Sequence, residues 1–379
     1  MPDDITILRD TQFADQINKM QELISQSARA FLFGAGASVC AGLPLIAELT
    51  TDVINDPALS LDTKEILEQV QNDFIGCPFA NIEDYMSEIV DIVAIGDRWK
   101  DRGVAKTTVA FDGKIFEAQA LKQSLKEIKQ AIAGVLDKKR IEIDTHRKFI
   151  KAIHQTLRAG KGVVSRPVDY FVLNYDTLIE DALALERLPY SDGFCGGATA
   201  WWHESSFGTE GNKARVIKLH GSIDWCRLDG DAVPRRIRKN LSIDLNEDEK
   251  VMIWPAATKY VETQRDPYAQ MLEFLRTTLR QDADVVLTVC GYRFADKHIN
   301  IEIDRALRES GKRLTIIVLT ELDEPQEKLK DWLSDSSVRE QIRIYSKRGF
   351  FHAATAIKAT NDLPWWKFEV LTRLLGGER

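Results

Sequence analysis

The chain has 379 residues, of which 44% are hydrophobic and 29% are charged, and its formal net charge is −7. This profile is typical of a soluble globular protein with one large domain or two domains, and its acidity argues against direct nucleic-acid binding. No apolar run approaches the roughly 18 residues of a membrane span, and the opening "MPDDITILRD" carries acids where a secretory signal carries bases. We therefore expect a cytoplasmic protein without a membrane partner.

The first predicted elements are a helix over 12–26 and a buried strand over 29–33, which a glycine turn ends. A further helix is expected after Gly42-Leu43-Pro44. From there the pattern is helical, with apolar residues at helical spacing over 61–75, 81–95 and 117–139. We interpret residues 51–165 as a helical insertion, which either covers the sheet and its site or serves as an assembly surface.

The second half alternates between strands and helices. Short β-branched runs predict strands over 168–174, 215–221, 284–291, 313–320 and 341–346, and helical stretches lie at 267–281 and 299–311. This alternation predicts an α/β fold, a Rossmann-like and mostly parallel sheet with helices on both faces. We expect a single domain over 1–379 that ends in a C-terminal helical segment over 350–379.

The cysteines and histidines give no sign of a metal site. No cysteine belongs to a C-x-x-C pair, and the histidine spacing is not that of metal ligands, so we expect no bound metal. An odd, scattered set fits free thiols in a reducing compartment. The cysteines are Cys40, Cys77, Cys195, Cys226 and Cys290.

The turn after the first strand reads Gly34-Ala35-Gly36-Ala37-Ser38. A strand, a Gly-x-Gly turn and a helix can hold a phosphate against backbone amides. The third glycine of the usual dinucleotide fingerprint is missing, because Val39 stands at its place. A plain strand-to-helix turn therefore stays open as an alternative.

Two polar turns follow later strands. Asn174 and Asp176 end the run over 168–174, where Asn174 could bond a sugar hydroxyl and Asp176 an amide NH₂, or both could cap the next helix. His220 ends the next strand just before Gly221, as a candidate general base or as a satisfied structural histidine.

A fourth turn, "GYRFADKHIN", follows the strand over 284–291. Gly291 could let a ligand approach the backbone, Arg293 could meet a phosphate, and Asp296 has the residue type of a helix cap. Because turns at the carboxyl ends of parallel strands share one edge of the sheet, these four turns should converge on one crevice.

In their order and spacing, "GAGASVCAGLP", "NYD", "KLHGS" and "GYRFADKHIN" resemble the sirtuin (SIR2-like) superfamily from about residue 30 to 300. "NIEDYM" and "GYRFADKHIN" are closer to the bacterial antiviral NAD hydrolases of that superfamily than to its protein deacetylases. The resemblance implies that Asn174 lies at the nicotinamide ribose, Asp176 at the carboxamide, and that His220 is the catalytic histidine. The NAD-binding residues that it implies are Gly34, Ala35, Gly36, Ala37, Ser38, Pro44, Asp176, Gly221, Gly291, Tyr292, Arg293 and Asp296.

Departures from the deacetylases concern the protein substrate. The two C-x-x-C zinc pairs and the Phe-Gly-Glu phrase of the deacetylases are missing, and the residues after Gly42-Leu43-Pro44 differ from those of the deacetylase motif. The resemblance therefore favours hydrolysis of NAD to nicotinamide and ADP-ribose, which would deplete NAD in antiphage defence. Open alternatives are a protein deacylase or ADP-ribosyltransferase, a cyclase, a non-catalytic NAD or ADP-ribose sensor and an interaction scaffold with a relic pocket.

Regulation is expected because a free NAD hydrolase would harm its own cell. By family analogy we expect a homo-oligomer and a separately encoded trigger, either a sensor or a HerA-type ring ATPase. The choice between NAD and NADP stays open.

Overall fold

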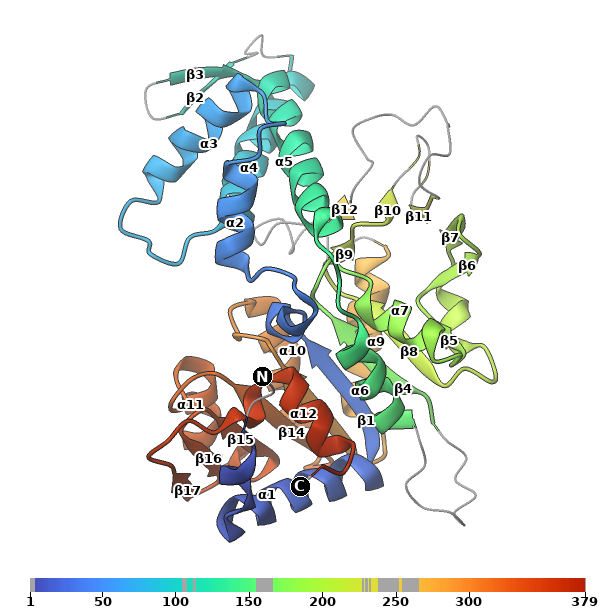
Figure 1. The fold of residues 1–379 in the computed structure, drawn as a ribbon. Coiled ribbons are helices and arrows are strands. Elements are labelled where there is room, and N and C mark those ends of the chain that lie inside the picture. The colour runs from blue at the N-terminus through green and yellow to red at the C-terminus, as the bar shows by residue number, and fades with distance from the viewer. Residues whose placement is uncertain are drawn as a thin grey trace.

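The computed structural model describes residues 4–103, 108–111, 114–154, 166–226, 228, 231, 233–237, 252–253 and 266–378. A nine-stranded sheet forms its centre (Figure 1). The strands are β1 (Ala28–Phe33), β4 (Val168–Val172), β5 (Tyr190–Ser191), β8 (Ala214–Lys218), β13 (Val285–Cys290), β14 (Leu314–Thr320), β15 (Ile342–Ser346), β16 (Gly349–His352) and β17 (Thr355–Lys358).

The strand order is β17-β16-β15-β14-β13-β1-β4-β8-β5. Neighbours from β15 to β5 are parallel, whereas β15, β16 and β17 pair antiparallel at the other edge. The predicted α/β class, with a mostly parallel Rossmann-like sheet, is confirmed.

Helices cover both faces of the sheet, so the central strands are buried on both sides. Along β1, Phe31 and Phe33 lie in one hydrophobic core and Leu32 lies in the other, as the alternation of side chains along a strand requires. One face is covered by α9 (Tyr268–Arg280), α10 (Lys297–Glu309) and α11 (Glu327–Ser334), and the other by α1 (Thr11–Gln26), α6 (Asp144–His154), α7 (Leu178–Leu185) and α12 (Phe368–Leu375).

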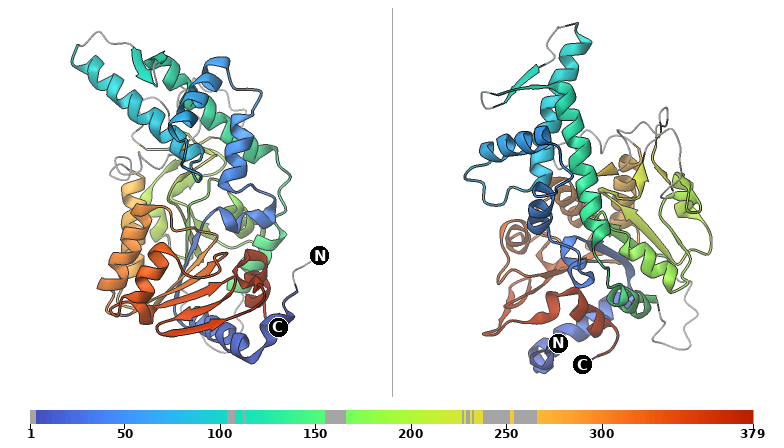
Figure 2. Two further views of the ribbon diagram at one scale, coloured as in Figure 1. Left: turned by 90° about the vertical axis from the view of Figure 1, so that its left-hand side faces the viewer. Right: turned by 45° about the horizontal axis from the view of Figure 1, so that its top comes forward.

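A separate helical unit projects beyond one end of the sheet (Figures 1 and 2). It consists of α2 (Ile46–Ile54), α3 (Leu61–Asp73), α4 (Ile82–Asp101), α5 (Ala118–Lys138) and the hairpin of β2 (Thr108–Phe111) and β3 (Lys114–Glu117). These helices enclose a third hydrophobic core. The unit thus runs from Ile46 to Lys138, whereas α6, inside the expected 51–165 insertion, packs on the sheet.

The expectation of a helical segment over 350–379 is wrong in its first part. Its opening residues continue β16, which with β17 adds two antiparallel strands to the sheet, and only the short 3-10 helix Pro364–Trp366 and α12 are helical. Gly349 permits this hairpin, because a Cβ there would lie 2.5 Å from the carbonyl oxygen of Ile357. Backbone pairing of β16 with β15 and of β17 with β16 therefore extends the sheet through the first part of this segment.

Small strands beyond β8 form two further sheets. One has the order β10-β11-β7-β6 and the other pairs β9 with β12. Their bounds are β6 (Phe194–Gly196), β7 (Ala200–Trp202), β9 (Gly221–Ser222), β10 (Trp225–Cys226), β11 (Arg235–Arg236) and β12 (Met252–Ile253). All five cysteines are free thiols.

Among the described residues, no single helix has the length and apolar character to cross a membrane. One bent pair, Ala35–Ala41 with Ile46–Ile54, passes the test by length and composition alone.

Candidate functional site

Four turns leave the sheet at the same level. Phe33, at the end of β1, pairs with Cys290 of β13 and with Val172 of β4, and Val172 pairs with Lys218 of β8. The next residues along each strand therefore emerge side by side at the carboxyl edge, where open parallel sheets bind ligands. The structure thus brings the four predicted turns together.

The glycines of the first and fourth turns pack backbone against backbone. A Cβ on Gly34 would lie 2.5 Å from the carbonyl oxygen of Gly291, and one on Gly36 would lie 2.7 Å from the Cα of Gly291. Gly291 also has a φ of 70°, in the left-handed region. The missing side chain of Gly291 thus makes room for the backbone of Gly36 and Ala37.

The amides of the glycine turn are mostly engaged within the protein. Those of Gly34 and Gly36 donate to the carbonyls of Cys290 and Gly291, and those of Ala37 and Ser38 donate to carbonyls inside the turn. The turn forms two short 3-10 helices, Ala35–Ala37 and Val39–Ala41. The next α-helix begins at Ile46, after the buried Pro44, which confirms the helix expected after Gly42-Leu43-Pro44.

Ser38 joins the first turn to the second. Its hydroxyl donates to Asp176 Oδ2 over 2.8 Å and accepts from Asn174 Nδ2 over 2.8 Å. Asn174 Nδ2 also lies 3.1 Å from the carbonyl oxygen of Gly34, and Asp176 Oδ1 accepts from the amide of Leu178. Asp176 therefore accepts from the first amide of α7 and binds Ser38, whereas the N-cap residue of α7 is Thr177.

His220 of the third turn lies against Asp296 of the fourth turn. His220 Nε2 lies 3.1 Å from Asp296 Oδ2, and both side chains are about nine-tenths buried. The other oxygen of Asp296 accepts from the amides of His298 and Ile299, which confirms Asp296 as the N-cap of α10.

The remaining predicted residues lie in the third and fourth turns. The Tyr292 hydroxyl lies 3.1 Å from the Asp296 carbonyl oxygen and donates to Asn300 Oδ1, which stabilises the fourth turn. Gly221 has a φ of 87° and pairs with β12. Arg293 is exposed, and its guanidinium lies 5.9 Å from the ring centroid of Phe79 in the helical unit.

Sequence reasoning missed a buried charged pair beneath the second turn. Lys218, only 1% exposed, donates a hydrogen bond to the backbone carbonyl of Asp176 and lies 3.8 Å from Glu180. Burial raises the pKa of Glu180 to about 7, although Lys218 opposes the rise. Only the tertiary structure shows that this lysine, two residues before His220, points at the neighbouring turn.

His146 of α6 also packs behind the site. It is 1% exposed, its ring centroid lies 4.8 Å from that of Phe368, and its Nδ1 has no hydrogen-bond partner in the described part of the chain. Burial lowers the pKa of His146 to about 4, although the charge of Asp176 and a hydrogen bond with the Ala37 backbone oppose the fall.

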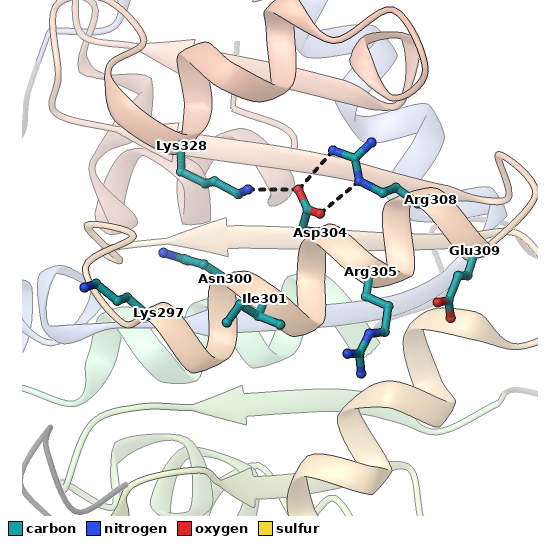
Figure 3. A pocket seen from close by; sticks show the side chains of 8 residues that line it. All are labelled: Lys297, Asn300, Ile301, Asp304, Arg305, Arg308, Glu309 and Lys328. Atoms are coloured by element: carbon teal, nitrogen blue, oxygen red, sulfur yellow. Dashed lines mark hydrogen bonds and ion pairs between the residues drawn. The ribbon is translucent and has the colours of Figure 1, made fainter. Parts of the chain in front are cut away.

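A cavity of about 570 Å³ lies elsewhere, on the outer side of α10. In Figure 3, Asp304 points toward Lys328 and Arg308, which bind it over 2.9 Å each, whereas Arg305 points away from this group. None of the predicted site residues lines this cavity. We place the candidate site at the strand ends because the polar side chains of four separate turns meet there.

Residues 169–340 match the family model of the SIR2-like domain. This range holds the turns of Asn174, His220 and Asp296, but neither the glycine turn nor the helical unit. No curated protein matches the chain.

Two solved structures are similar over nearly the full length. A Sir2 homologue mutant in complex with ADP-ribose is 12% identical, with 95% of this chain and 96% of that chain covered and a TM-score of 0.38. A structure described as a basis for the mechanism and regulation of Sir2 enzymes is 14% identical, with 96% and 99% covered and a TM-score of 0.40.

Proposed function

We propose that this chain is an NAD hydrolase that cleaves the bond between nicotinamide and ribose and releases nicotinamide and ADP-ribose. The observation that carries the proposal is that the His220–Asp296 pair and the Ser38–Asn174–Asp176 cluster share one edge of the sheet. The match to the SIR2-like domain supports it, because that match spans Asn174, Asp176, His220 and Asp296.

Each side chain has a role consistent with its contacts. Nicotinamide is already cationic in NAD, so it leaves with the bonding electron pair and needs no acid, while positive charge develops on the ribose. Water then attacks the anomeric carbon, and the imidazole of His220 takes the proton of that water. Asp296 Oδ2 lies 3.1 Å from Nε2 of the ring, so its negative charge stabilises the imidazolium that forms.

The second turn holds the substrate in this proposal. Asn174 Nδ2 bonds inward to Ser38 and Gly34, so the amide oxygen of Asn174 is the atom that accepts from a ribose hydroxyl or from the attacking water. Each oxygen of Asp176 keeps a second lone pair beyond its bonds to Ser38 and Leu178, which suits the amide group of nicotinamide. Positioning by fixed polar groups should contribute more than proton transfer.

The test follows nicotinamide release from NAD and from NADP by chromatography, with mass spectrometry for linear and cyclic ADP-ribose. We expect His220→Ala to lower turnover about 10²- to 10⁴-fold, whereas the exposed His203→Ala serves as the matched control. Equal release by the wild-type protein and His220→Ala would remove His220 from the reaction. Binding of ADP-ribose without any release would favour a sensor, and transfer to an acyl-peptide or a protein would favour the deacylase or transferase.

We further propose that the activity depletes NAD in antiphage defence inside the cytoplasm, under control of oligomerisation or of a partner such as a HerA-type ATPase. The support is the resemblance of the motifs alone. Phage plating on cells that express the wild-type protein or His220→Ala, with and without a co-expressed HerA-type ATPase, tests it together with light scattering for the subunit number. Equal plating on both strains in every combination would contradict the defence role.

A further inference from the structure

The second turn faces two structural units at once. Asn174 and Asp176 point toward the glycine turn, where both bond Ser38. Tyr175 and Leu178 instead belong to the hydrophobic core of the helical unit, and Tyr175 is only 7% exposed. Residues on either side of Tyr175 therefore serve the proposed chemistry, while Tyr175 itself is held by the helices.

Glu83 makes the polar contact at this junction. The Tyr175 hydroxyl donates to Glu83 Oε1 over 2.6 Å, a length typical of a strong hydrogen bond to a carboxylate. Burial raises the pKa of Tyr175 well above its ordinary value, and Glu83 adds to the rise, so the hydroxyl keeps its proton and remains a donor.

The end of α4 that carries Glu83 is firmly anchored. Asn81 and Asp84 form a capping box around the first turn of α4. The Thr50 hydroxyl of α2 accepts from the amide of Ile82, which ties α4 to its neighbour. Glu83 is therefore held in a fixed position within the helical unit, so a movement of the unit moves Glu83 with it.

Tyr175 also reaches the loop that follows His220. Its backbone carbonyl accepts from the amide of Ile223 over 3.1 Å and from the hydroxyl of Ser222 over 3.2 Å. A single residue thus links the helical unit, the Asn174–Asp176 turn and the His220 loop, so a shift of its ring would move both groups of proposed catalytic side chains.

We propose that Glu83 is a positioning residue of the candidate site, which acts through Tyr175 to hold the Asn174–Asp176 turn and the His220 loop in their working geometry. The inference rests on the proposed NAD cleavage and goes beyond it, because it makes turnover depend on how the helical unit is docked. It also gives a role to the "NIEDYM" motif, in which Glu83 lies.

The experiment compares Glu83→Ala, Glu83→Gln, Tyr175→Phe and the double variant Glu83→Ala/Tyr175→Phe. The control is Asp91→Asn, an exposed carboxylate on the same helix. A displaced turn should lower kcat about 10- to 100-fold and leave KM within about threefold, because the groups that bind the rest of NAD remain. Glu83→Gln should recover part of the loss, since its amide oxygen still accepts from Tyr175.

The double variant should be no worse than the worse single variant, because both remove the same contact. Additive losses, or a kcat for Glu83→Ala equal to that of Asp91→Asn, would overturn the inference. Melting curves and circular dichroism confirm that each variant is folded.

Hydrogen–deuterium exchange separates this inference from the proposed function. In Glu83→Ala the amides of residues 173–178 and 219–224 should exchange faster, while those of β1 should not change. This result is expected even if the wild-type protein cleaves no NAD, in which case the proposed function fails and the positioning contact stands. Unchanged exchange at 173–178 would reject the positioning role even in an active hydrolase.

Discussion

Replacing Gly291 with alanine tests whether the glycine turn and the fourth turn must touch. The new Cβ would lie 2.6 Å from the carbonyl carbon and 2.8 Å from the Cα of Gly36. Both are backbone atoms, so no side chain can rotate away. The two turns would have to separate, which weakens the bonds that Gly34 and Gly36 donate to Cys290 and Gly291.

The expected loss of stability has two parts. A φ of 70° costs an alanine about 1–2 kcal/mol, and overpacking against fixed atoms costs about 1–3 kcal/mol. Gly291→Ala should therefore lower the free energy of unfolding by about 2–5 kcal/mol. Gly311→Ala is the matched control, because its φ is 60° but the nearest atom, 3.2 Å away, is the end of the Arg313 side chain.

Urea titration followed by tryptophan fluorescence measures both variants. Gly311→Ala should lose only the backbone part, about 1–2 kcal/mol, and it should keep its NAD-cleaving activity. Gly291→Ala should lose more stability and most of its activity, since the separated turns carry Ser38 and Asp296 apart. Equal unfolding free energies for the two variants would refute the argument that backbone contact between the turns makes Gly291 necessary.

Two further predictions concern buried charges. Lys218→Met should lower the free energy of unfolding by about 3–5 kcal/mol, because it leaves Glu180 buried without its partner. In the same urea titration, Lys218→Met/Glu180→Gln should recover part of this loss, and the control Lys213→Met, at an exposed position, should lose almost nothing. A loss for Lys218→Met no larger than that for Lys213→Met would contradict the pairing. His146 titrates near pH 4 in the fold but near its ordinary pKa of about 6.5 when unfolded. Its contribution to stability is therefore fully present above pH 6.5 and is lost as the pH falls to 4, by about 3 kcal/mol; unfolding free energies at steps across this window should show the slope, and an equally steep slope in His146→Gln would refute it.

Much of the sheet could be predicted from sequence because its central strands are short, apolar and β-branched. The predicted run over 284–291, for example, became β13 with every residue buried. The hairpin of β16 and β17 could not be predicted, since its strands have four residues each and are held by the backbone pairing of β16 with β15 and of β17 with β16.

The residues of the candidate site also divide into those that could be predicted from the sequence and those that could not. Asn174, Asp176 and His220 were predictable because polar residues directly after parallel strands reach one edge. Glu83 and Lys218 were not, because each acts on a turn that lies far along the chain, through Tyr175 in one case and through the carbonyl of Asp176 in the other. Periodicity indicates which face a residue takes but not which distant turn it meets.

Three supports hold the Asn174–Asp176 turn, and each acts on different atoms. Ser38 bonds its two outer side chains, Lys218 bonds its last carbonyl, and Glu83 bonds the ring between them. The supports come from the glycine turn, from β8 and from the helical unit. A three-residue turn has few internal torsions, so it cannot absorb the loss of one support without moving the groups that the other two hold. The helical unit is therefore part of the geometry of the site, and a change in its docking reaches Asn174 and Asp176 through Tyr175.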